Sequence, residues 1–294
     1  MNSIRLKAYA KINLGLDVLG NRPNGYHDVR MIMQSIGLHD KINISLQKRD
    51  EITVNTNLHY LPTNENNLVY KAAKLIKTEF QINTGVVINL EKKIPVAAGL
   101  AGGSSDAAAT LYGLNKLFRL NIPMNQLMEY GLQLGADVPF CLHRGTALSE
   151  GIGEVLTTLP HMPSCYILLV KPDISVSTKF VYENLDLAEN ILHPDIDGMI
   201  AAIKNQNLNH LIDHLGNVLE TVTTKEYPII QQIKEKMLEL GALGSMMSGS
   251  GPTVFGIYTD KKTAQKAYYY FKVNHYGKQV FLTQPFFKQS PMKN

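Results

Sequence analysis

The 294-residue chain has no tryptophan, only two cysteines, and no apolar run long enough to span a bilayer as a helix. Its lysines and arginines never form a run longer than a pair, so a nucleic-acid interface is not indicated. Cys141 and Cys165 lie in apolar surroundings without Cys-x-x-Cys spacing, which argues against a metal site and favours buried thiols. The first residues enter a strand pattern with no signal-peptide core. We therefore expect a cytoplasmic protein with no metal-ligating residues and no membrane or nucleic-acid partner.

Two common phosphate-binding motifs are also missing. No glycine-rich stretch ends in Gly-Lys-Ser/Thr, which excludes a Walker A loop. The glycines at 99, 102 and 103 do not fit Gly-x-Gly-x-x-Gly, which excludes a Rossmann turn and the protein-kinase loop. The composition is otherwise ordinary, with 45% hydrophobic and 18% charged residues and a net charge of +4. This length is enough for two domains, each with its own core.

A run of small residues from Pro95 to Asp106 is the most informative segment of the chain. Its three glycines relax the backbone, so successive N–H groups can point at one ligand. Ser104, Ser105 and Asp106 suit the N-cap and first turn of the helix that follows. A glycine-rich loop that leads into a helix N-terminus typically binds phosphate. A tight turn that only packs the helix against a strand is the alternative, and the two serines favour phosphate.

Strict alternation predicts a half-buried strand over residues 4–18, in which every even position is apolar. It places Lys11 and Asn13 on the polar face, two residues apart. Further patterns predict a turn at 21–25, hairpins at 146–159 and 242–258, and strands at 29–36, 41–46, 51–55, 85–90, 166–170 and 279–282. One helix is predicted from the glycine-rich loop to about residue 118. Other helices are predicted at 67–80, 124–134, 178–185, 196–204, 208–219, 228–240 and 261–273. A boundary at 161–164 separates two α+β domains, residues 1–162 and 163–294.

Asp137 stands between small and apolar residues in the segment 135–140. Burying an isolated carboxylate is costly, and Lys11 is a suitable partner because an ion pair keeps both groups charged. Taken alone, Asp137 is better explained as the N-cap of a short turn that opens at Pro139.

Five motifs in the same order along the chain resemble the GHMP kinases, the small-molecule kinases that include galactokinase, homoserine kinase and mevalonate kinase. They are residues 10–14 (AKINL), 25–27 (GYH), 95–107 (PVAAGLAGGSSDA), 135–140 (GADVPF) and 247–253 (MSGSGPT). Each motif is weak alone, but together they are specific and cover essentially the whole chain. One departure is Tyr9, at a position where the family usually has proline.

The resemblance implies a two-domain α+β fold. The N-terminal domain would be like a ribosomal-protein fold with a left-handed βαβ crossover, an exception to the usual handedness. The C-terminal domain would be ferredoxin-like. The implied reaction transfers the γ-phosphoryl group of ATP, with Mg²⁺, to the 2-hydroxyl of a cytidine-diphosphate-linked methylerythritol in non-mevalonate isoprenoid biosynthesis.

The resemblance also implies roles for individual residues. Asp137 would accept the proton of the attacking hydroxyl, and Lys11 would orient Asp137 and stabilise charge near the transferred phosphoryl group. Tyr26 would stack on the cytosine ring and His27 would hydrogen-bond its edge. The ATP phosphates would bind Pro95, Val96, Ala97, Ala98, Gly99, Leu100, Ala101, Gly102, Gly103, Ser104 and Ser105, and the substrate would bind Asn13, Tyr26, His27, Tyr182, Gly249, Ser250 and Gly251.

Alternatives stay open at this point. Tyr182 is also explained as a partly buried core residue, and residues 248–251 as a simple hairpin. Another GHMP kinase activity is disfavoured by the Gly-Tyr-His motif at 25–27. A nucleotide-binding protein without catalysis is disfavoured by Lys11, Asp137 and the intact glycine-rich loop. We expect a monomer or a weak homodimer.

Overall fold

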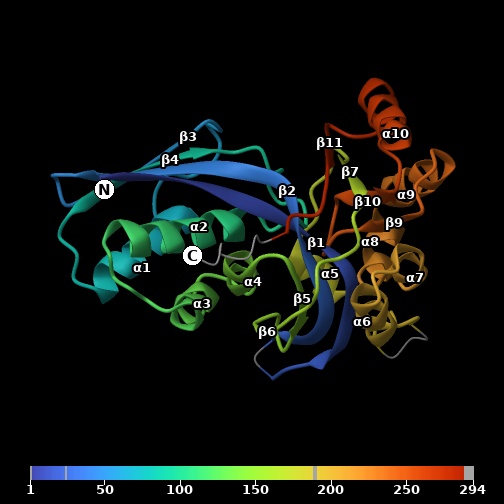
Figure 1. Cartoon of the computed structure of the whole chain (residues 1–294), viewed down its shortest axis with the longest axis horizontal. Helices are drawn as coiled ribbons and strands as arrows, with labels where there is room; N and C mark the ends of the chain where they lie inside the picture. Colours follow the sequence, from blue (N-terminus) through green and yellow to red (C-terminus); the bar gives the residue numbers. More distant parts are fainter. Residues whose placement is uncertain (1, 24, 188–190, 288–294) are drawn as a thin grey trace. The chain divides into compact units, whose positions relative to one another are not determined.

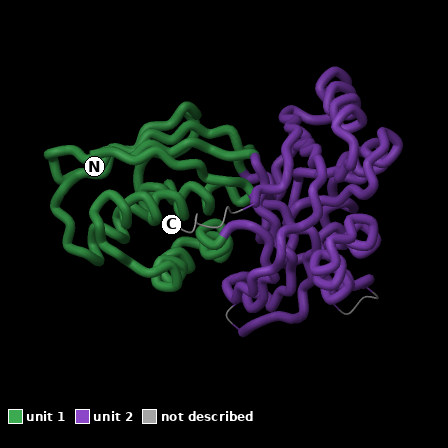
Figure 2. The backbone as a smooth tube through the Cα atoms, viewed as in Figure 1, with its two compact units in different colours: residues 1–10, 38–96, 101–143 green, residues 11–37, 97–100, 144–294 purple. Residues whose placement is uncertain are grey.

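The computed structural model describes residues 2–23, 25–187 and 191–287, so Asn24 of the predicted turn lies outside the described residues. The chain divides into two compact units (Figure 2). Unit 1 comprises residues 1–10, 38–96 and 101–143, and unit 2 comprises residues 11–37, 97–100 and 144–294. Because each unit is assembled from separate segments, the domain boundary expected at 162/163 stays a prediction.

Strands and helices alternate irregularly along the chain (Figure 1). The strands are β1 (Ser3–Asn21), β2 (His27–Gln47), β3 (Ile52–Thr56), β4 (Gly85–Glu91), β5 (Thr146–Glu150), β6 (Val155–Thr158), β7 (Tyr166–Lys171), β8 (Gly216–Asn217), β9 (Gly244–Met247), β10 (Val254–Tyr258) and β11 (Gln279–Thr283). The helices are α1 (Leu68–Glu79), α2 (Gly102–Leu117), α3 (Met124–Leu132), α4 (Val138–His143), α5 (Thr178–Glu183), α6 (Ile196–Lys204), α7 (Leu208–Asp213), α8 (Glu220–Glu226), α9 (Ile229–Glu239) and α10 (Lys261–Val273).

In unit 1, helices pack on one face of a sheet ordered β3-β4-β2-β1 (Figure 1). β3 and β4 are parallel and are connected through α1, and β2 runs antiparallel to β4. α1 begins at Leu68 because the side chain of Asn67 accepts the N–H of Val69 at 2.9 Å. Apolar residues of α1 and α2 and the inward positions of β2 and β4 form one continuous buried cluster. This core supports the start of α2, where the glycine-rich loop ends.

In unit 2, β7, β9, β10 and β11 form an antiparallel sheet in the order β11-β7-β10-β9. α9 packs against β9 and β10, and α10 packs against β7 and β11. A strand order in which the first strand lies between the last and the third is the ferredoxin-like arrangement. The expected α+β class with a ferredoxin-like C-terminal part is therefore confirmed. The handedness of the crossover in unit 1 stays a prediction.

Unit 2 also contains parts of β1 and β2, together with β5, β6 and β8. β5 pairs with β2 and with β6, which confirms the predicted hairpin at 146–159. β8 pairs with β1 in parallel, at Gly15↔Gly216 and Leu16↔Asn217. The helix predicted over 208–219 is therefore wrong beyond Asp213, because the chain there leaves α7 to pair with β1.

β2 also differs from expectation, since it is one strand where the sequence predicted two. Ile36 forms an isolated bridge with Pro285, and the N–H of Gly37 donates to the carbonyl of Gln284 at 2.9 Å. These partners support the strand through the stretch where the alternation is interrupted. Among the described helices, none is both long and apolar enough to cross a membrane.

Candidate active site

Lys11 and Asn13 project from β1 on the same face, as the alternation predicted, but both are buried. The Lys11 ammonium donates to Oδ1 of Asn13 at 2.8 Å, and the amide nitrogen of Asn13 contacts the sulfur of Met31 at 3.2 Å. The expectation that the polar face keeps Lys11 away from the core is therefore wrong. Burying an ammonium is costly, so its position is set by polar partners, of which Asn13 is one.

The glycine-rich loop has the irregular backbone that the sequence predicted. Ala97, Gly99 and Ala101 have positive φ angles of 50°, 73° and 54°. α2 then begins at Gly102, and its N-cap Ala101 makes no side-chain capping bond. The first N–H groups of a helix have no partner within the helix, so this N-terminus can bind an anion. Ser104 and Ser105 lie in the first turn, as expected, but the expected N-cap is wrong, because the helix starts before these residues and before Asp106.

The two serines of the first turn have different surroundings. The buried Ser105 hydroxyl donates to the carbonyl of Tyr9 at 2.6 Å and so holds α2 against β1 within unit 1. Ser104 is half-buried, and its hydroxyl makes no hydrogen bond to any described residue. Ser104 is therefore the serine whose hydroxyl is available to a ligand.

Asp106 belongs to a buried charge cluster with Asp40 and Lys92 in unit 1. The Lys92 ammonium donates to Oδ2 of Asp106 at 2.7 Å and also to Oδ2 of Asp40. Oδ1 of Asp40 accepts the backbone N–H groups of Lys93 and Ile94, whereas the buried Oδ1 of Asp106 has no hydrogen-bond partner among the described residues. Asp106 thus anchors α2 from within the core, not from the anion-binding surface.

Burial raises the pKa of the Asp106 carboxyl well above its ordinary value, although the Lys92 ammonium opposes that shift. Burial alone lowers the pKa of Lys92, but its attraction to Asp106 and Asp40 outweighs this effect, so the net pKa is raised. Both pKa values are raised because two buried carboxyl groups share one ammonium group.

The C-terminal glycine turn contacts the glycine-rich loop within unit 2. The Ser248 hydroxyl donates to the carbonyl of Gly99 at 2.9 Å. A Cβ at Gly99 would lie 2.0 Å from the Ser248 carbonyl oxygen, and a Cβ at Gly249 would lie 3.5 Å from Oδ1 of Asn13. The N–H of Lys11 also donates to the carbonyl of Leu100 at 3.1 Å. Three motifs that are far apart in sequence therefore meet at β1.

Asp137 directly precedes α4 in unit 1 and is half-buried. Its carbonyl accepts the N–H of Cys141 at 3.0 Å, and this hydrogen bond closes the first turn of that short helix. The position agrees with the helix-opening role that the sequence offered for Asp137 alone. Lys11 belongs to unit 2, whereas Asp137 belongs to unit 1.

The residues expected at the cytidine end gather in unit 2. The rings of His27 and Tyr182 are 4.8 Å apart between centroids and are tilted by 43°. Tyr26 is 54% exposed, so its ring is open to a ligand. α5, which carries Tyr182, is joined to the glycine turn by a hydrogen bond of 2.8 Å between the hydroxyls of Thr178 and Ser250.

Sequence reasoning missed Thr178 and Asn217, which both hydrogen-bond to the glycine turn. Asn217 lies within residues 208–219, where the sequence wrongly predicted a continuous helix. The glycine immediately before it was the one local signal of a break in that helix.

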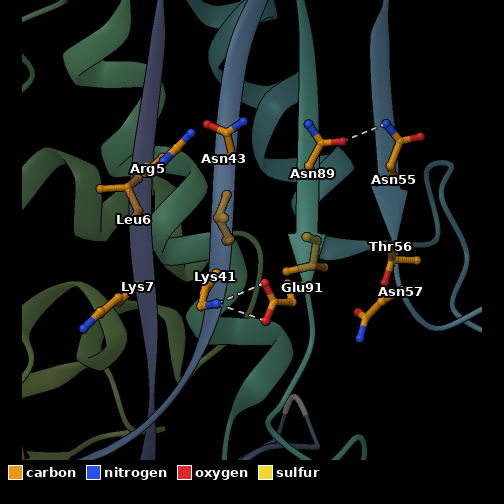
Figure 3. A pocket seen from close by; sticks show the side chains of 12 residues that line it. Arg5, Leu6, Lys7, Lys41, Asn43, Asn55, Thr56, Asn57, Asn89 and Glu91 are labelled. Carbon is orange, nitrogen blue, oxygen red and sulfur yellow. Dashed lines mark hydrogen bonds and ion pairs between the residues drawn. The ribbon is translucent and has the colours of Figure 1, made fainter.

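A cavity of about 800 Å³ contains none of the predicted site residues. It is a hollow on the sheet of unit 1, lined by residues of β1, β2 and β4 and by residues of β3 and its C-terminal end (Figure 3). Lys41 pairs there with Glu91, and Asn55 donates to Asn89 at 3.0 Å. No three His, Cys, Asp or Glu side chains in the described ranges are arranged to hold a metal ion.

Comparison with known families agrees with this arrangement. Residues 67–145 match the model of the GHMP kinases N terminal domain, and residues 187–277 match that of the GHMP kinases C terminal domain. The first segment includes the glycine-rich loop and Asp137, and the second includes the turn at 248–251. The protein is thus a GHMP kinase, a small-molecule kinase that uses ATP.

Two curated relatives narrow the family. The 4-diphosphocytidyl-2-C-methyl-D-erythritol kinase of Lachnoclostridium phytofermentans is 63% identical, over 97% of this chain and 98% of its own. The enzyme of the same name from Lachnospira eligens is 56% identical, over 97% and 99%. The chain belongs to the family of 4-diphosphocytidyl-2-C-methyl-D-erythritol kinases.

Solved structures agree with the fold. The crystal structure of a 4-(cytidine 5'-diphospho)-2C-methyl-D-erythritol kinase matches with a TM-score of 0.82 and 29% identity, over 97% of this chain and all of that chain. A homoserine kinase from Cytophaga hutchinsonii matches with a TM-score of 0.76 and 21% identity, over 99% and 96%. At that identity the second likeness shows the fold alone.

Proposed function

We propose that the protein transfers the γ-phosphoryl group of ATP to the 2-hydroxyl of 4-diphosphocytidyl-2-C-methyl-D-erythritol, a step of non-mevalonate isoprenoid biosynthesis. The observation that carries the proposal is the 63% identity to a kinase of that name over nearly the whole chain. The meeting of Asn13, the glycine-rich loop and the glycine turn in unit 2 supports it, because phosphoryl transfer depends chiefly on positioning and electrostatics.

Lys11 and Asp137 are the proposed catalytic pair. Asp137 accepts the proton of the attacking hydroxyl, and Lys11 orients Asp137 and stabilises the charge on the transferred group. The buried setting of Lys11 supports this role, because an ammonium acts more strongly on nearby charge where water is excluded. A loose phosphoryl-transfer transition state depends more on positioning than on the strength of the base, so a carboxylate is sufficient.

The ATP phosphates bind the loop from Pro95 to Ser105 through backbone N–H groups and the start of α2. Mg²⁺ would be held mainly by phosphate oxygens, since it prefers phosphates, water and few protein ligands. The Ser104 hydroxyl is the loop side chain with a free oxygen to offer, which fits that pattern. When bound, the ion would neutralise charge on the phosphates.

The cytidine end of the substrate binds at Tyr26, His27 and Tyr182. The contact between His27 and Tyr182 supports a shared base-binding place, and Tyr26 supplies an exposed ring that can stack on cytosine. The methylerythritol end binds near Asn13 and the turn from Gly249 to Gly251, whose positive φ angles of 58° and 87° let the backbone approach a ligand closely.

A substrate panel tests the proposal. The purified protein is given ATP and Mg²⁺ with the cytidine substrate, mevalonate or homoserine in turn, and ADP formation is coupled to NADH oxidation. We expect kcat/KM for the cytidine substrate to exceed that for the other two alcohols by at least 10³-fold. Preference for mevalonate or homoserine would replace the proposed substrate, and no turnover with any of them would favour a nucleotide-binding protein. A cytoplasmic location and a monomer or weak homodimer remain part of the proposal.

A further inference from the structure

The backbone of the glycine turn is well defined by its own hydrogen bonds. The N–H of Ser248 donates to the carbonyl of Thr253 at 2.9 Å, and the N–H of Gly251 donates to the carbonyl of Ser248 at 3.0 Å. The N–H groups of Gly249 and Ser250 donate to no described residue. Such amides need a partner on a ligand or in water. The direction in which these two N–H groups point depends on the residues that hold the turn in place.

The amide nitrogen of Asn217 holds the glycine turn, and the side-chain oxygen is also hydrogen-bonded. Its amide nitrogen donates to the carbonyl of Met247 at 2.9 Å and to that of Gly249 at 2.8 Å. Its Oδ1 accepts the N–H of Leu219 at 3.0 Å. The residue is buried, with 7% of its surface exposed. An amide side chain has two donor hydrogens, and both are used to hold the last residue of β9 and the first glycine of the turn.

Glu220 provides a second hold on the same backbone. Its Oε1 accepts the N–H of Met247 at 2.7 Å, and its Oε2 accepts from the Lys234 ammonium at 2.6 Å. Asn217 therefore binds the carbonyl of Met247 while Glu220 binds its N–H. Asn217 is the last residue of β8 and Glu220 is the first residue of α8, so both side chains come from the short stretch 217–220.

That segment is attached to the strand that carries Lys11 and Asn13. Asn217 pairs with Leu16 of β1, and the N–H of Val218 donates to the carbonyl of Leu16 at 3.0 Å. Gly249 in turn lies close to Oδ1 of Asn13. The path from β1 through Asn217 to the glycine turn lies wholly within unit 2.

We propose that Asn217 is a positioning residue, which fixes the glycine turn relative to β1 so that the free N–H groups of Gly249 and Ser250 face the acceptor substrate. The inference rests on the proposed function, because it assigns those amides to the phosphorylated alcohol or its diphosphate. Glu220 assists by holding the other side of Met247.

Asn217→Asp tests this role because it keeps the shape of the side chain and removes both donors. Its carboxylate would face two carbonyl oxygens, so the turn should shift. Asn115→Asp is the matched control. Asn115 is also buried, and it also bridges backbone groups, with Nδ2 to the carbonyl of Ile122 at 2.9 Å and Oδ1 from its N–H at 3.0 Å. It lies near the C-terminal end of α2, away from the glycine-rich loop.

We expect both variants to lose a similar amount of Tm, and only Asn217→Asp to change substrate binding. For Asn217→Asp, KM and the calorimetric Kd for the cytidine substrate should rise about tenfold, the effect of about 1.4 kcal/mol. The KM for ATP should stay within about twofold. Glu220→Met removes the second hold, and its KM for the cytidine substrate should rise about threefold, so the inference stays testable if Asn217→Asp does not fold.

Unchanged KM and Kd in Asn217→Asp, or equal changes in Asn115→Asp, would show that Asn217 has a structural role only. An equal rise for ATP and for the cytidine substrate would also overturn the inference, since it assigns the turn to the acceptor. Failure of the proposed function has a different signature, namely no turnover of the cytidine substrate by the unaltered protein. In that case the KM of Asn217→Asp relative to that of the unaltered protein is measured for the acceptor that the substrate panel identifies.

Discussion

The Ser248 hydroxyl donates to the carbonyl of Gly99 at 2.9 Å, across 149 residues of sequence. This bond joins the two glycine-rich segments of the chain within unit 2. The backbone of Ser248 also lies close to residue 99. This explains why residue 99 is glycine, because a Cβ there would lie 2.0 Å from the Ser248 carbonyl oxygen. The φ of 73° at Gly99 adds a second constraint, since side chains disfavour that conformation.

Gly99→Ala is therefore expected to destabilise the protein and abolish most of its turnover. The left-handed backbone costs an alanine about 1–2 kcal/mol, and the contact with Ser248 must also be relieved. Gly145→Ala is the matched control, because Gly145 has a φ of 83° but nothing within 4 Å of its Cβ position. Urea unfolding should show a larger loss for Gly99→Ala. Equal losses with full activity in both variants would mean that the contact with Ser248 is not important.

Lys11→Met should reduce kcat by at least about 10²-fold while leaving the affinity for ATP within a few-fold. In the proposed mechanism the loop amides hold most of the phosphate, whereas Lys11 acts on charge that develops during transfer. Lys41→Met, at an exposed lysine paired with Glu91, is the control and should keep normal turnover. If ATP binding vanished while kcat at saturation stayed normal, Lys11 would be a binding residue and its assigned role would be wrong.

Asp137→Asn should fold normally and lose nearly all turnover, by about 10²–10⁴-fold. The change is nearly isosteric, so the start of α4 is kept while proton acceptance is lost. Asp260→Asn is the control, because Asp260 also opens a helix, with its side chain accepting the N–H of Thr263 at 2.7 Å. Steady-state turnover and circular dichroism of both variants are the measurement. Turnover like that of the unaltered protein would remove Asp137 from the mechanism.

Tyr26→Ala should weaken binding of the cytidine substrate far more than binding of ATP. Stacking of a base on an aromatic ring is worth about 1–3 kcal/mol, so affinity should fall about ten- to a hundredfold. Tyr60→Ala is the control at another exposed tyrosine, and it should bind both ligands normally. Calorimetric titration measures both affinities. No loss for the cytidine ligand would refute the stacking role, and equal losses for both ligands would indicate a folding defect.

Asp106→Asn should leave stability nearly unchanged at low pH and raise it at high pH relative to the unaltered protein. Because burial raises the folded pKa of Asp106 above its unfolded value of 3.8, ionisation costs stability as the pH rises through that window. Lys92 keeps Asp40 as its partner in the variant.

Asp40→Asn is the contrasting change, since Asp40 binds Lys92 and two backbone N–H groups. It should lose about 3 kcal/mol. Urea unfolding of both variants at pH 5 and pH 8 is the measurement. A stability of Asp106→Asn that falls with rising pH as steeply as that of the unaltered protein would contradict the assigned ionisation.

Local patterns predicted most of the elements, because alternation and capping are read from neighbouring residues. The alternation in β1 placed Lys11 and Asn13 on one face correctly, and the helix expected at 67–80 is present as α1. The failures are non-local. Leu208, Leu211 and Leu215 continue a helical spacing, but pairing of Gly216 and Asn217 with β1 ends the helix early. No pattern in the neighbouring residues indicates that this stretch pairs with β1.

The candidate site shows the same limit. The irregular backbone of the glycine-rich loop and the helix that follows it could be predicted from residues 95–106 alone. Its contact with Ser248 and the hold of Asn217 on the turn depend on residues more than a hundred positions from the loop. The capping of α2 was also mispredicted, because the left-handed backbone of Ala101 starts the helix without a side-chain cap.

The central claim is the position to which the phosphoryl group is transferred. Phosphorus NMR of the product formed from ATP and 4-diphosphocytidyl-2-C-methyl-D-erythritol tests it most directly. The account predicts one new phosphomonoester signal on the tertiary 2-hydroxyl, equal in amount to the ADP formed, with the cytidine diphosphate signals intact. A phosphomonoester on another hydroxyl, or ADP formed without any new ester, would contradict it.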